Sequence, residues 1–205
     1  MREPDLCRFA DRRIHHIKGE PVKFYYEGDE PGGQMLSWFK LQLKAIGTLW
    51  DAELPEAALT IIYSGIDSFG WLAAPPDVLD ASRTTFKQWC ETYILTRLQS
   101  VDGAPITSED LYAARCGILH TSTPLSRSER AGNARQVFYQ FKGKTYVNLI
   151  LNAPQMPVRL DIASLGLAFK DGGIAFIAHL NCDPLRRKAA DDRATHFLRQ
   201  VTVVP

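Results

Sequence analysis

The apolar stretch PEAALTIIYSGIDSFGW, residues 55–71, is the strongest structural signal in this chain. Its large apolar side chains recur at the three- and four-residue spacing of a helix, as Leu59, Ile62, Ile66 and Phe69. Pro55 suits the first turn of such a helix, and Pro75-Pro76 ends it. A helix with so little polar surface is expected at the centre of a helical bundle.

Further amphipathic helices are predicted around this central one. Residues 34–50 place their apolar side chains on one helical face, and residues 82–98 repeat that pattern. Thr107 precedes Asp110 by three residues, which is typical of a capping box, so another helix is predicted from Ser108. The first two faces consist of Met35, Leu36, Phe39, Leu43, Ile46 and Trp50, and of Phe86, Trp89, Cys90, Tyr93 and Ile94. The predicted fold is therefore mainly α.

The pattern changes after Pro124. Residues 136–150 alternate with period two around Lys142-Gly143, which predicts a β-hairpin at about 135–151. From Leu160 the chain is expected to return to helices, with Gly172-Gly173 as an interruption and Asp183-Pro184 at the start of a basic helix. We expect residues 34–205 to form a single domain. Residues 1–33 are predicted to be a peripheral arm with one strand at 22–27.

Composition limits the kind of protein this chain can be. It has 205 residues, 45% of them hydrophobic, and a net charge of +1, so any RNA contact must use a local patch. Its longest apolar runs are too short to cross a membrane. The N-terminus lacks the apolar core of a signal peptide. The widely spaced Cys7, Cys90, Cys116 and Cys182 are expected to be reduced thiols, so we predict a cytoplasmic protein.

The segment Arg115-Cys116-Gly117-Ile118-Leu119-His120 carries the main functional signal. Arginine is rarely buried without a partner, and histidine is the side chain that titrates near neutral pH. On an ideal α-helix, at about 100° per residue, Arg115 and His120 point about 140° apart. That geometry suits a helix whose two sides line a groove between two bodies.

Arg115 and His120 have the chemistry needed to cleave RNA without a metal. The 2′-hydroxyl must lose a proton, the leaving oxygen must gain one, and the phosphate charge must be stabilised. One histidine serves one proton role at a time, so this chemistry predicts a symmetric dimer with a shared site. In the purely structural alternative, Arg115 pairs with Asp67 or Glu109 and His120 caps its own helix. The protein is then a helical interaction module.

Three further groups of residues are candidates for a functional role. Asp67 lies on a polar stripe of the central helix and either orients Arg115 or His120 or is a structural polar group. Arg127, Arg130 and Arg135 follow His120 and either track an RNA backbone or belong to a solvated loop. His179 and Cys182 are three residues apart, but no second pair accompanies them, so we predict neither a metal site nor a cofactor.

The segment Leu111–His120 resembles the signature helix of HEPN domains, which carry an arginine, four to six residues and then a histidine. The surroundings resemble the same group: Ile66–Gly70 its second helix, Phe86–Ile94 the helix before the signature, and the hairpin with Asp183–Arg186 its tail. The resemblance covers about residues 35–200. It implies a HEPN-like helical bundle that dimerises through the signature helices.

The resemblance also implies a function. HEPN proteins are often metal-independent endoribonucleases, and Arg115 and His120 match their catalytic residues. Such enzymes act in stress or phage defence, in some cases as toxins with a neutralising protein partner. Active members usually have a polar residue directly after the arginine, where this chain has Cys116. The alternative that the resemblance implies is a non-catalytic module that binds RNA, a nucleotide or a protein.

Overall fold

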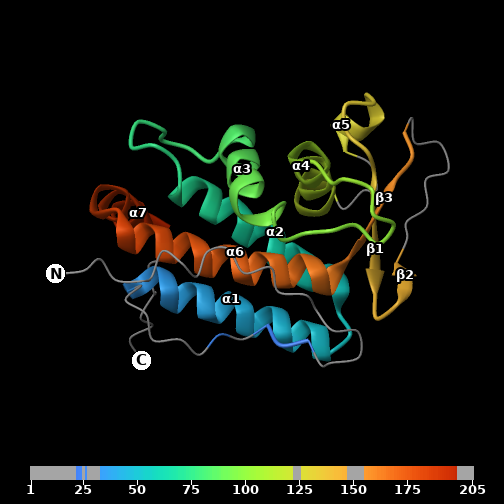
Figure 1. The fold of residues 1–205 in the computed structure, drawn as a ribbon, viewed down its shortest axis with the longest axis horizontal. Coiled ribbons are helices and arrows are strands. Elements are labelled where there is room, and N and C mark those ends of the chain that lie inside the picture. The colour runs from blue at the N-terminus through green and yellow to red at the C-terminus, as the bar shows by residue number, and fades with distance from the viewer. Residues whose placement is uncertain (1–21, 25, 27–32, 122–125, 147–154, 198–205) are drawn as a thin grey trace.

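The structure is a computed structural model that describes residues 22–24, 26, 33–121, 126–146 and 155–197. It is mainly helical, as the sequence predicts (Figure 1). Its elements are α1 (Gly33–Asp51), α2 (Pro55–Leu72), α3 (Arg83–Trp89), the π turn η2 (Cys90–Ile94), α4 (Ser108–Cys116), the π turn η3 (Gly117–Thr121), α5 (Arg127–Arg130), β1 (Val137–Phe141), β2 (Lys144–Tyr146), β3 (Val158–Asp161), α6 (Ile162–Cys182) and α7 (Pro184–Phe197).

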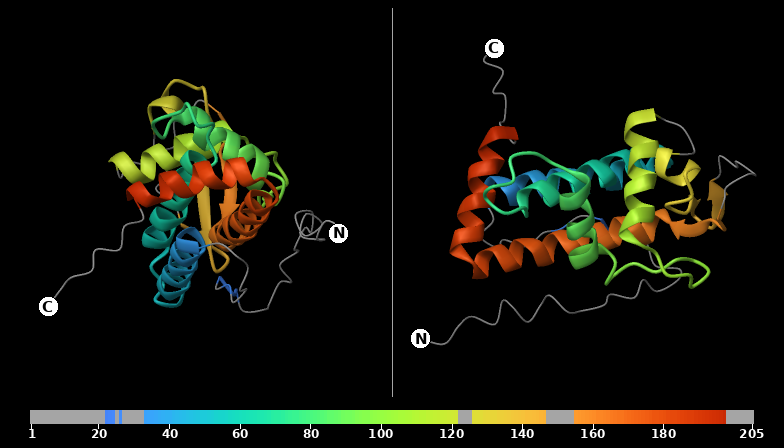
Figure 2. Two further views of the ribbon diagram at one scale, coloured as in Figure 1. Left: turned by 90° about the vertical axis from the view of Figure 1, so that its left-hand side faces the viewer. Right: turned by 90° about the horizontal axis from the view of Figure 1, so that it is seen from above.

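The long helices α1, α2 and α6 form the body of the molecule, and all three contact one another. Helix α7 lies at one end of this body and the small sheet at the other, as Figures 1 and 2 show from different sides. The segments α3–η2 and α4–η3 pack across α2. The central position predicted for the helix at residues 55–71 is therefore confirmed.

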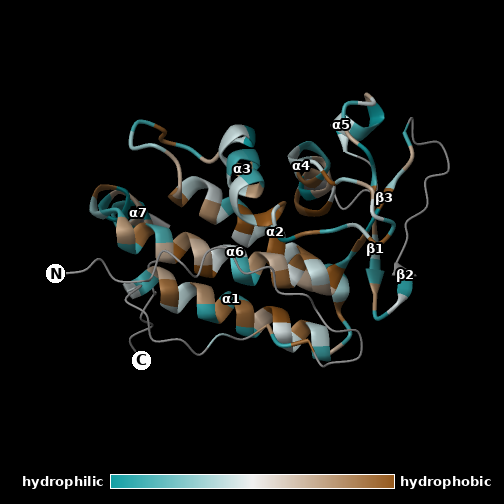
Figure 3. Ribbon diagram, viewed as in Figure 1, coloured by the Kyte–Doolittle hydropathy of each residue, from teal (hydrophilic) through white to brown (hydrophobic). Residues whose placement is uncertain are grey.

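The core of the bundle is an aromatic cluster around Phe69 of α2. Its ring centroid lies 5.1–5.4 Å from those of Trp38, Phe39, Trp89 and Phe176, and 5.9 Å from that of Phe169. These rings come from α1, α3 and α6, so one side chain joins four helices. Hydrophobic and hydrophilic residues alternate along α1 in Figure 3, and all six residues predicted for its apolar face are buried.

The predicted interruption at Gly172-Gly173 is wrong, because α6 runs without a break from Ile162 to Cys182. The two glycines are instead places of close approach. A Cβ on Gly172 would lie 2.7 Å from the carbonyl oxygen of Tyr93, and a Cβ on Gly173 would overlap the ring of Phe39. The absence of side chains here lets η2 and α1 pack directly against α6.

Gly172→Ala is expected to destabilise the protein by about 1–3 kcal/mol, because the obstacle is a backbone carbonyl that cannot rotate away. Gly47→Ala in α1 is the matched control. Its Cβ would meet only the Cβ of Phe24, at 4.0 Å, so the better helix propensity of alanine should stabilise the protein by up to about 1 kcal/mol. Urea unfolding of both variants measures the difference. Equal effects of the two substitutions would contradict the close packing at Gly172.

The helix predicted at residues 82–98 begins as expected, with Ser82 and Thr85 forming a capping box. It then widens into the π turn η2 and ends at Ile94, four residues earlier than predicted. The five apolar residues predicted for its face are all buried. Their spacing therefore located the buried face correctly, although the last turn is not α-helical.

The predicted hairpin is confirmed as far as the structure describes it. Strands β1 and β2 are antiparallel, with Phe141 opposite Lys144. The expectation that helices begin at Leu160 is wrong, because Val158–Asp161 forms β3, which pairs in parallel with β1. Val158 and Leu160 are fully buried, and Asp161 caps α6 by accepting a hydrogen bond from Ser164 N.

Part of the predicted N-terminal arm packs into the core. Phe24 is buried, and its ring lies 5.5 Å from that of Trp50, edge to face. Residues 22–24 and 26 are not in a strand, contrary to the prediction for 22–27. The rest of the arm, the hairpin beyond Tyr146 and the C-terminal tail lie outside the described residues.

Candidate functional site

The segment with Arg115 and His120 lies on α4 and its continuation η3. Thr107 and Asp110 form the predicted capping box: Thr107 Oγ1 accepts from Asp110 N, and Asp110 Oδ2 accepts from Thr107 N. The α-helix ends at Cys116, and Gly117–Thr121 continue it as a π turn. The two residues therefore lie on one continuous helical segment, as the sequence predicts.

The π turn changes how Arg115 and His120 relate to each other. In a π turn the hydrogen bond joins residues five apart, so such residues stack much as residues four apart do in an α-helix. The separation of about 140° assumed an ideal α-helix throughout. Because Gly117–Thr121 form a π turn, the backbone angle between Arg115 and His120 is smaller than that value. The side chain of His120 itself lies outside the described residues.

Arg115 forms an ion pair with Asp67 of α2, at 2.5 Å between Nη2 and Oδ2. This is one of the two partners expected from the sequence. Burial opposes the charge on Arg115, but the hydrogen bond and the charge of Asp67 outweigh it, and the pKa of Arg115 is raised. The side chains of Arg115 and Asp67 are 13% and 22% exposed, so the pair is partly accessible to solvent.

Tyr112 and Cys116 complete the surroundings of Arg115. The guanidinium carbon lies 6.0 Å from the ring centroid of Tyr112, within cation–π range. Burial and the neighbouring Cys116 raise the pKa of Tyr112, so its phenol keeps its proton at neutral pH. Cys116 is a free, half-buried thiol. Cys116 also contributes to the raised pKa of Arg115, so it belongs to the same cluster.

Glu109, the other expected partner of Arg115, instead connects α4 to two other elements. It pairs with Arg83 and Lys87 of α3, at 2.5 and 3.1 Å, and accepts a hydrogen bond from Ser128 of α5. Burial opposes its charge, but Arg83, Lys87 and Ser128 outweigh this effect and lower the pKa of Glu109. The guanidinium carbon of Arg83 also lies 5.6 Å from the ring centroid of Tyr112. No sequence signal marks this cluster, because its members are distant along the chain.

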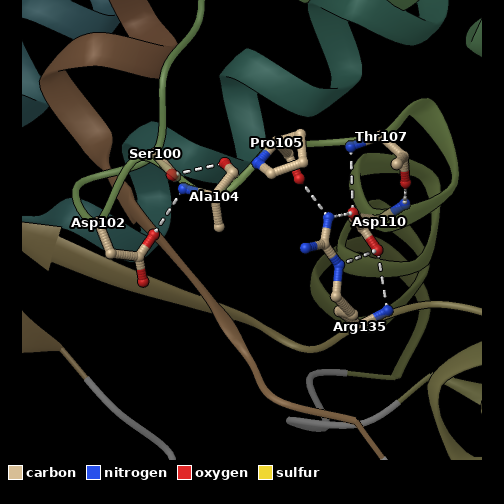
Figure 4. A network of polar contacts seen from close by, with 7 residues as sticks. All are labelled: Ser100, Asp102, Ala104, Pro105, Thr107, Asp110 and Arg135. Carbon is tan, nitrogen blue, oxygen red and sulfur yellow. Dashed lines mark hydrogen bonds and ion pairs between the residues drawn. The ribbon is translucent and has the colours of Figure 1, made fainter.

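The three arginines predicted to contact RNA do not share one environment. Arg127 and Arg130 are exposed on the short helix α5. Arg135 is instead held by Asp110: its backbone N and its Nη2 donate to the carboxylate at 2.8 and 2.5 Å, and Nη2 also donates to the carbonyl of Pro105 (Figure 4). The guanidinium of Arg135 thus ties the start of β1 to the start of α4.

Asp110 is expected to make the stability of the protein depend on pH. Burial opposes ionisation of its carboxyl, but hydrogen bonds from Arg135 and Thr107 outweigh burial and lower its pKa. A group with a lowered folded-state pKa stabilises the fold above its unfolded pKa, and this contribution is lost as pH falls through the folded value. Asp110→Asn should therefore cost about 3 kcal/mol at pH 7 and much less at acidic pH.

Urea unfolding at pH 7 and at pH 3 tests this expectation. Asp192→Asn is the matched control, because its ion pair with Lys188 joins two exposed side chains. Exposed pairs contribute about 0–1 kcal/mol, so this variant should be nearly neutral at both pH values. A cost of Asp110→Asn that is the same at both pH values would contradict the role of the charge.

Comparison with family models, with curated proteins and with solved structures finds no match to this chain. In the part of the chain that the structure describes, no helix is long and apolar enough to cross a membrane. Among the same residues, no group of three or more His, Cys, Asp or Glu side chains is arranged to hold a metal ion. His179 instead bonds to Tyr93, and Cys182 is exposed.

Proposed function

We propose that this protein is a metal-independent endoribonuclease of the HEPN type, with Arg115 and His120 as its catalytic residues. The observation that carries the proposal is the π turn Gly117–Thr121, which makes the backbone angle between Arg115 and His120 smaller than on an ideal α-helix. π turns inside α-helices occur frequently at functional sites. An arginine and a histidine that are closer together around a helix can act on the same phosphate.

The surroundings of Arg115 support this role. The raised pKa keeps the guanidinium charged, and Asp67 fixes its orientation from one side. A guanidinium presents several N–H donors in a planar fork, so one edge can hold Asp67 while another binds a phosphate oxygen. In the reaction, the 2′-hydroxyl attacks the adjacent phosphate and the 5′-oxygen leaves. Arg115 stabilises the phosphate charge, and His120 transfers protons. The product is a 2′,3′-cyclic phosphate.

The reaction needs a base and an acid at the same phosphate, so the proposal includes a homodimer. Two chains that meet through α4–η3 would bring two copies of Arg115 and His120 to one groove. Half-buried Ile118 and Leu119 on η3 offer apolar surface for such a contact. We place the enzyme in the cytoplasm, in stress or phage defence, where a toxic ribonuclease would need a neutralising protein partner. Arg127 and Arg130 would contact the RNA backbone beside the groove.

The test is an RNA cleavage assay with the purified full chain in EDTA. We expect cleavage and fragments that end in a 2′,3′-cyclic phosphate. Arg115→Ala should abolish cleavage while the helical circular dichroism spectrum is kept. Loss of all activity in EDTA, with recovery on addition of Mg²⁺, would contradict the metal-independent mechanism.

A non-catalytic binding module is the second candidate, and the Asp67 carboxylate favours it. This group already neutralises Arg115 at 2.5 Å, so a phosphate would have to share the guanidinium with it. Such a module would form a folded dimer that cleaves no RNA. If Arg115 is only a structural partner of Asp67, Arg115→Met together with Asp67→Leu should leave stability and every function nearly unchanged.

A further inference from the structure

Two cations on α3, Arg83 and Lys87, lie beside the candidate ribonuclease site and have no role in the proposed reaction. They are four residues apart, so they occupy the same face of the helix. Both pair with Glu109 of α4, at 2.5 and 3.1 Å. Figure 1 shows α3, α4 and α5 in a row along the upper side of the bundle, and α4 contacts both of the others. The two cations therefore belong to the surface where α3 meets α4.

The charges at this surface do not balance. Like charges four residues apart on a helix repel each other, and Arg83 and Lys87 share the single carboxylate of Glu109. Glu91, one turn beyond Lys87, instead accepts a hydrogen bond from Ser108. Among the described residues neither cation has a second acidic partner, and their side chains are 54% and 31% exposed. One positive charge is therefore available to an anion from solution.

Tyr112 connects these cations to Arg115. The guanidinium carbons of Arg83 and Arg115 lie 5.6 and 6.0 Å from the centroid of its ring. Glu109 raises the pKa of Arg83 most, and Tyr112 and Cys116 add to the rise. Arg83 is therefore within electrostatic range of the helical segment that carries Arg115. A strand that contacts Arg115 passes within reach of Arg83.

Arg83 and Arg115 are oriented in the same way. Each donates through Nη2 to a carboxylate on a neighbouring helix, which is Glu109 for Arg83 and Asp67 for Arg115. A guanidinium is a planar fork with several N–H donors, so a carboxylate on one nitrogen fixes the group and leaves other donors for a phosphate. Two oriented guanidiniums on one surface match the regularly repeated phosphates of a nucleic acid strand.

The spacing along α4 fits one strand of RNA. Glu109 and Arg115 are six residues apart, which is about 9 Å along the axis of an α-helix. Stacked nucleotides rise about 3.4 Å each, so this length covers about three nucleotides. Ser128 joins Glu109 to α5, which carries two exposed arginines. A strand along α4 would therefore meet Arg115 first, then the two cations of α3, and then α5.

We propose that Arg83 and Lys87 bind a second phosphate of the RNA substrate, within about three nucleotides of the scissile phosphate. The inference rests on the proposed ribonuclease function, because it takes Arg115 as the contact of the scissile phosphate. Glu109 is a positioning residue, since it orients both cations and does not touch the RNA. Contacts to phosphate carry no base preference. The site would therefore select strands of several nucleotides by length and not by sequence.

The test is the binding of fluorescent 2′-O-methyl hexauridylate to the full chain, followed by anisotropy at several salt concentrations. This probe cannot be cleaved, because its 2′-oxygens carry methyl groups. Arg83→Gln with Lys87→Gln removes the second phosphate contact. It should weaken binding about tenfold at low salt, the effect of one charged hydrogen bond. It should also lower the slope of log affinity against log salt by about 0.7, the value for one phosphate contact of a single strand.

Two further variants control for charge and for location. Arg83→Lys keeps the positive charge and should keep the salt slope. Arg186→Gln with Lys188→Gln is the matched double control, because it removes two exposed, ion-paired cations from α7. This control should bind the probe as the unchanged protein does.

Cleavage assays separate a lost phosphate contact from damage to the catalytic site. Arg83→Gln with Lys87→Gln should raise KM for unmodified hexauridylate about tenfold, in line with the loss in binding, and should keep kcat. Diuridylate has a single phosphate, so its cleavage should not change. Binding with the expected salt slopes but without cleavage by any of the proteins would contradict the ribonuclease function and not the phosphate contact. Failure of the unchanged protein to bind the probe, an unchanged slope in the double variant, or an equal decrease in the α7 control would overturn the proposal.

Discussion

Replacing His120 with alanine is expected to lower the rate of RNA cleavage about 10²–10⁴-fold, the usual contribution of general acid–base catalysis. The proposed dimer has no other group assigned to the proton transfers, so both copies of the shared site lose this function together. The decrease in cleavage rate should appear in kcat, because the contact between Arg115 and the phosphate is kept. Single-turnover cleavage of a short labelled RNA measures it.

Two comparisons separate catalysis from structure. His179→Ala removes a histidine from α6, outside the proposed site, and should leave cleavage unchanged. Arg115→Lys keeps the charge but loses the planar fork that holds Asp67 and a phosphate at once, so it should retain only a small part of the activity. Cleavage at the normal rate by a folded His120→Ala dimer would exclude the mechanism.

Phe69→Ala is expected to destabilise the protein by about 3–5 kcal/mol, the cost of removing a large aromatic side chain from a packed core. The effect should reach the upper part of this range, because five rings from α1, α3 and α6 surround Phe69. Natural domains have a total stability of about 5–15 kcal/mol, so this is a large share of it. Urea unfolding followed by circular dichroism provides the measurement.

Phe69→Leu is the milder variant to measure if Phe69→Ala fails to fold. It leaves a smaller cavity and should lower the free energy of unfolding by about 1–2 kcal/mol. Leu79→Ala is the control, because Leu79 is 80% exposed and its truncation should change stability by less than about 0.5 kcal/mol. Similar unfolding midpoints for Phe69→Leu, Leu79→Ala and the unchanged protein would contradict the central position of Phe69.

The helical frame could be predicted from the sequence because its signals are local. The buried face of α1, the start of α2 at Pro55 and the capping box at Thr107 depend on residues within a few positions of one another. The hairpin at Lys142-Gly143 is local in the same way. The pairing of Arg115 with Asp67 was one of two options, and only the packing of α4 against α2 decided between them.

The missed features depend on contacts between distant segments. Strand β3 has only four residues, and its partner β1 ends seventeen residues before it, so no hairpin signal exists. The two π turns carry apolar residues in a pattern that differs from that of an α-helix by only one position. The sequence therefore does not distinguish them from α-helix. Gly172-Gly173 was taken as a break because glycine disfavours helices, whereas its role depends on Tyr93 and Phe39, which lie far away in the sequence.

The position of Phe69 also has a consequence for synthesis on the ribosome. Two of its ring partners, Trp38 and Phe39, precede it, whereas Phe169 and Phe176 are made last. At roughly 5–20 residues per second, the apolar face of α1 and α2 waits several seconds for α6. The nascent chain thus exposes this face to chaperones and to neighbouring chains until residue 176 leaves the exit tunnel. The bundle is completed after translation reaches α6, not helix by helix.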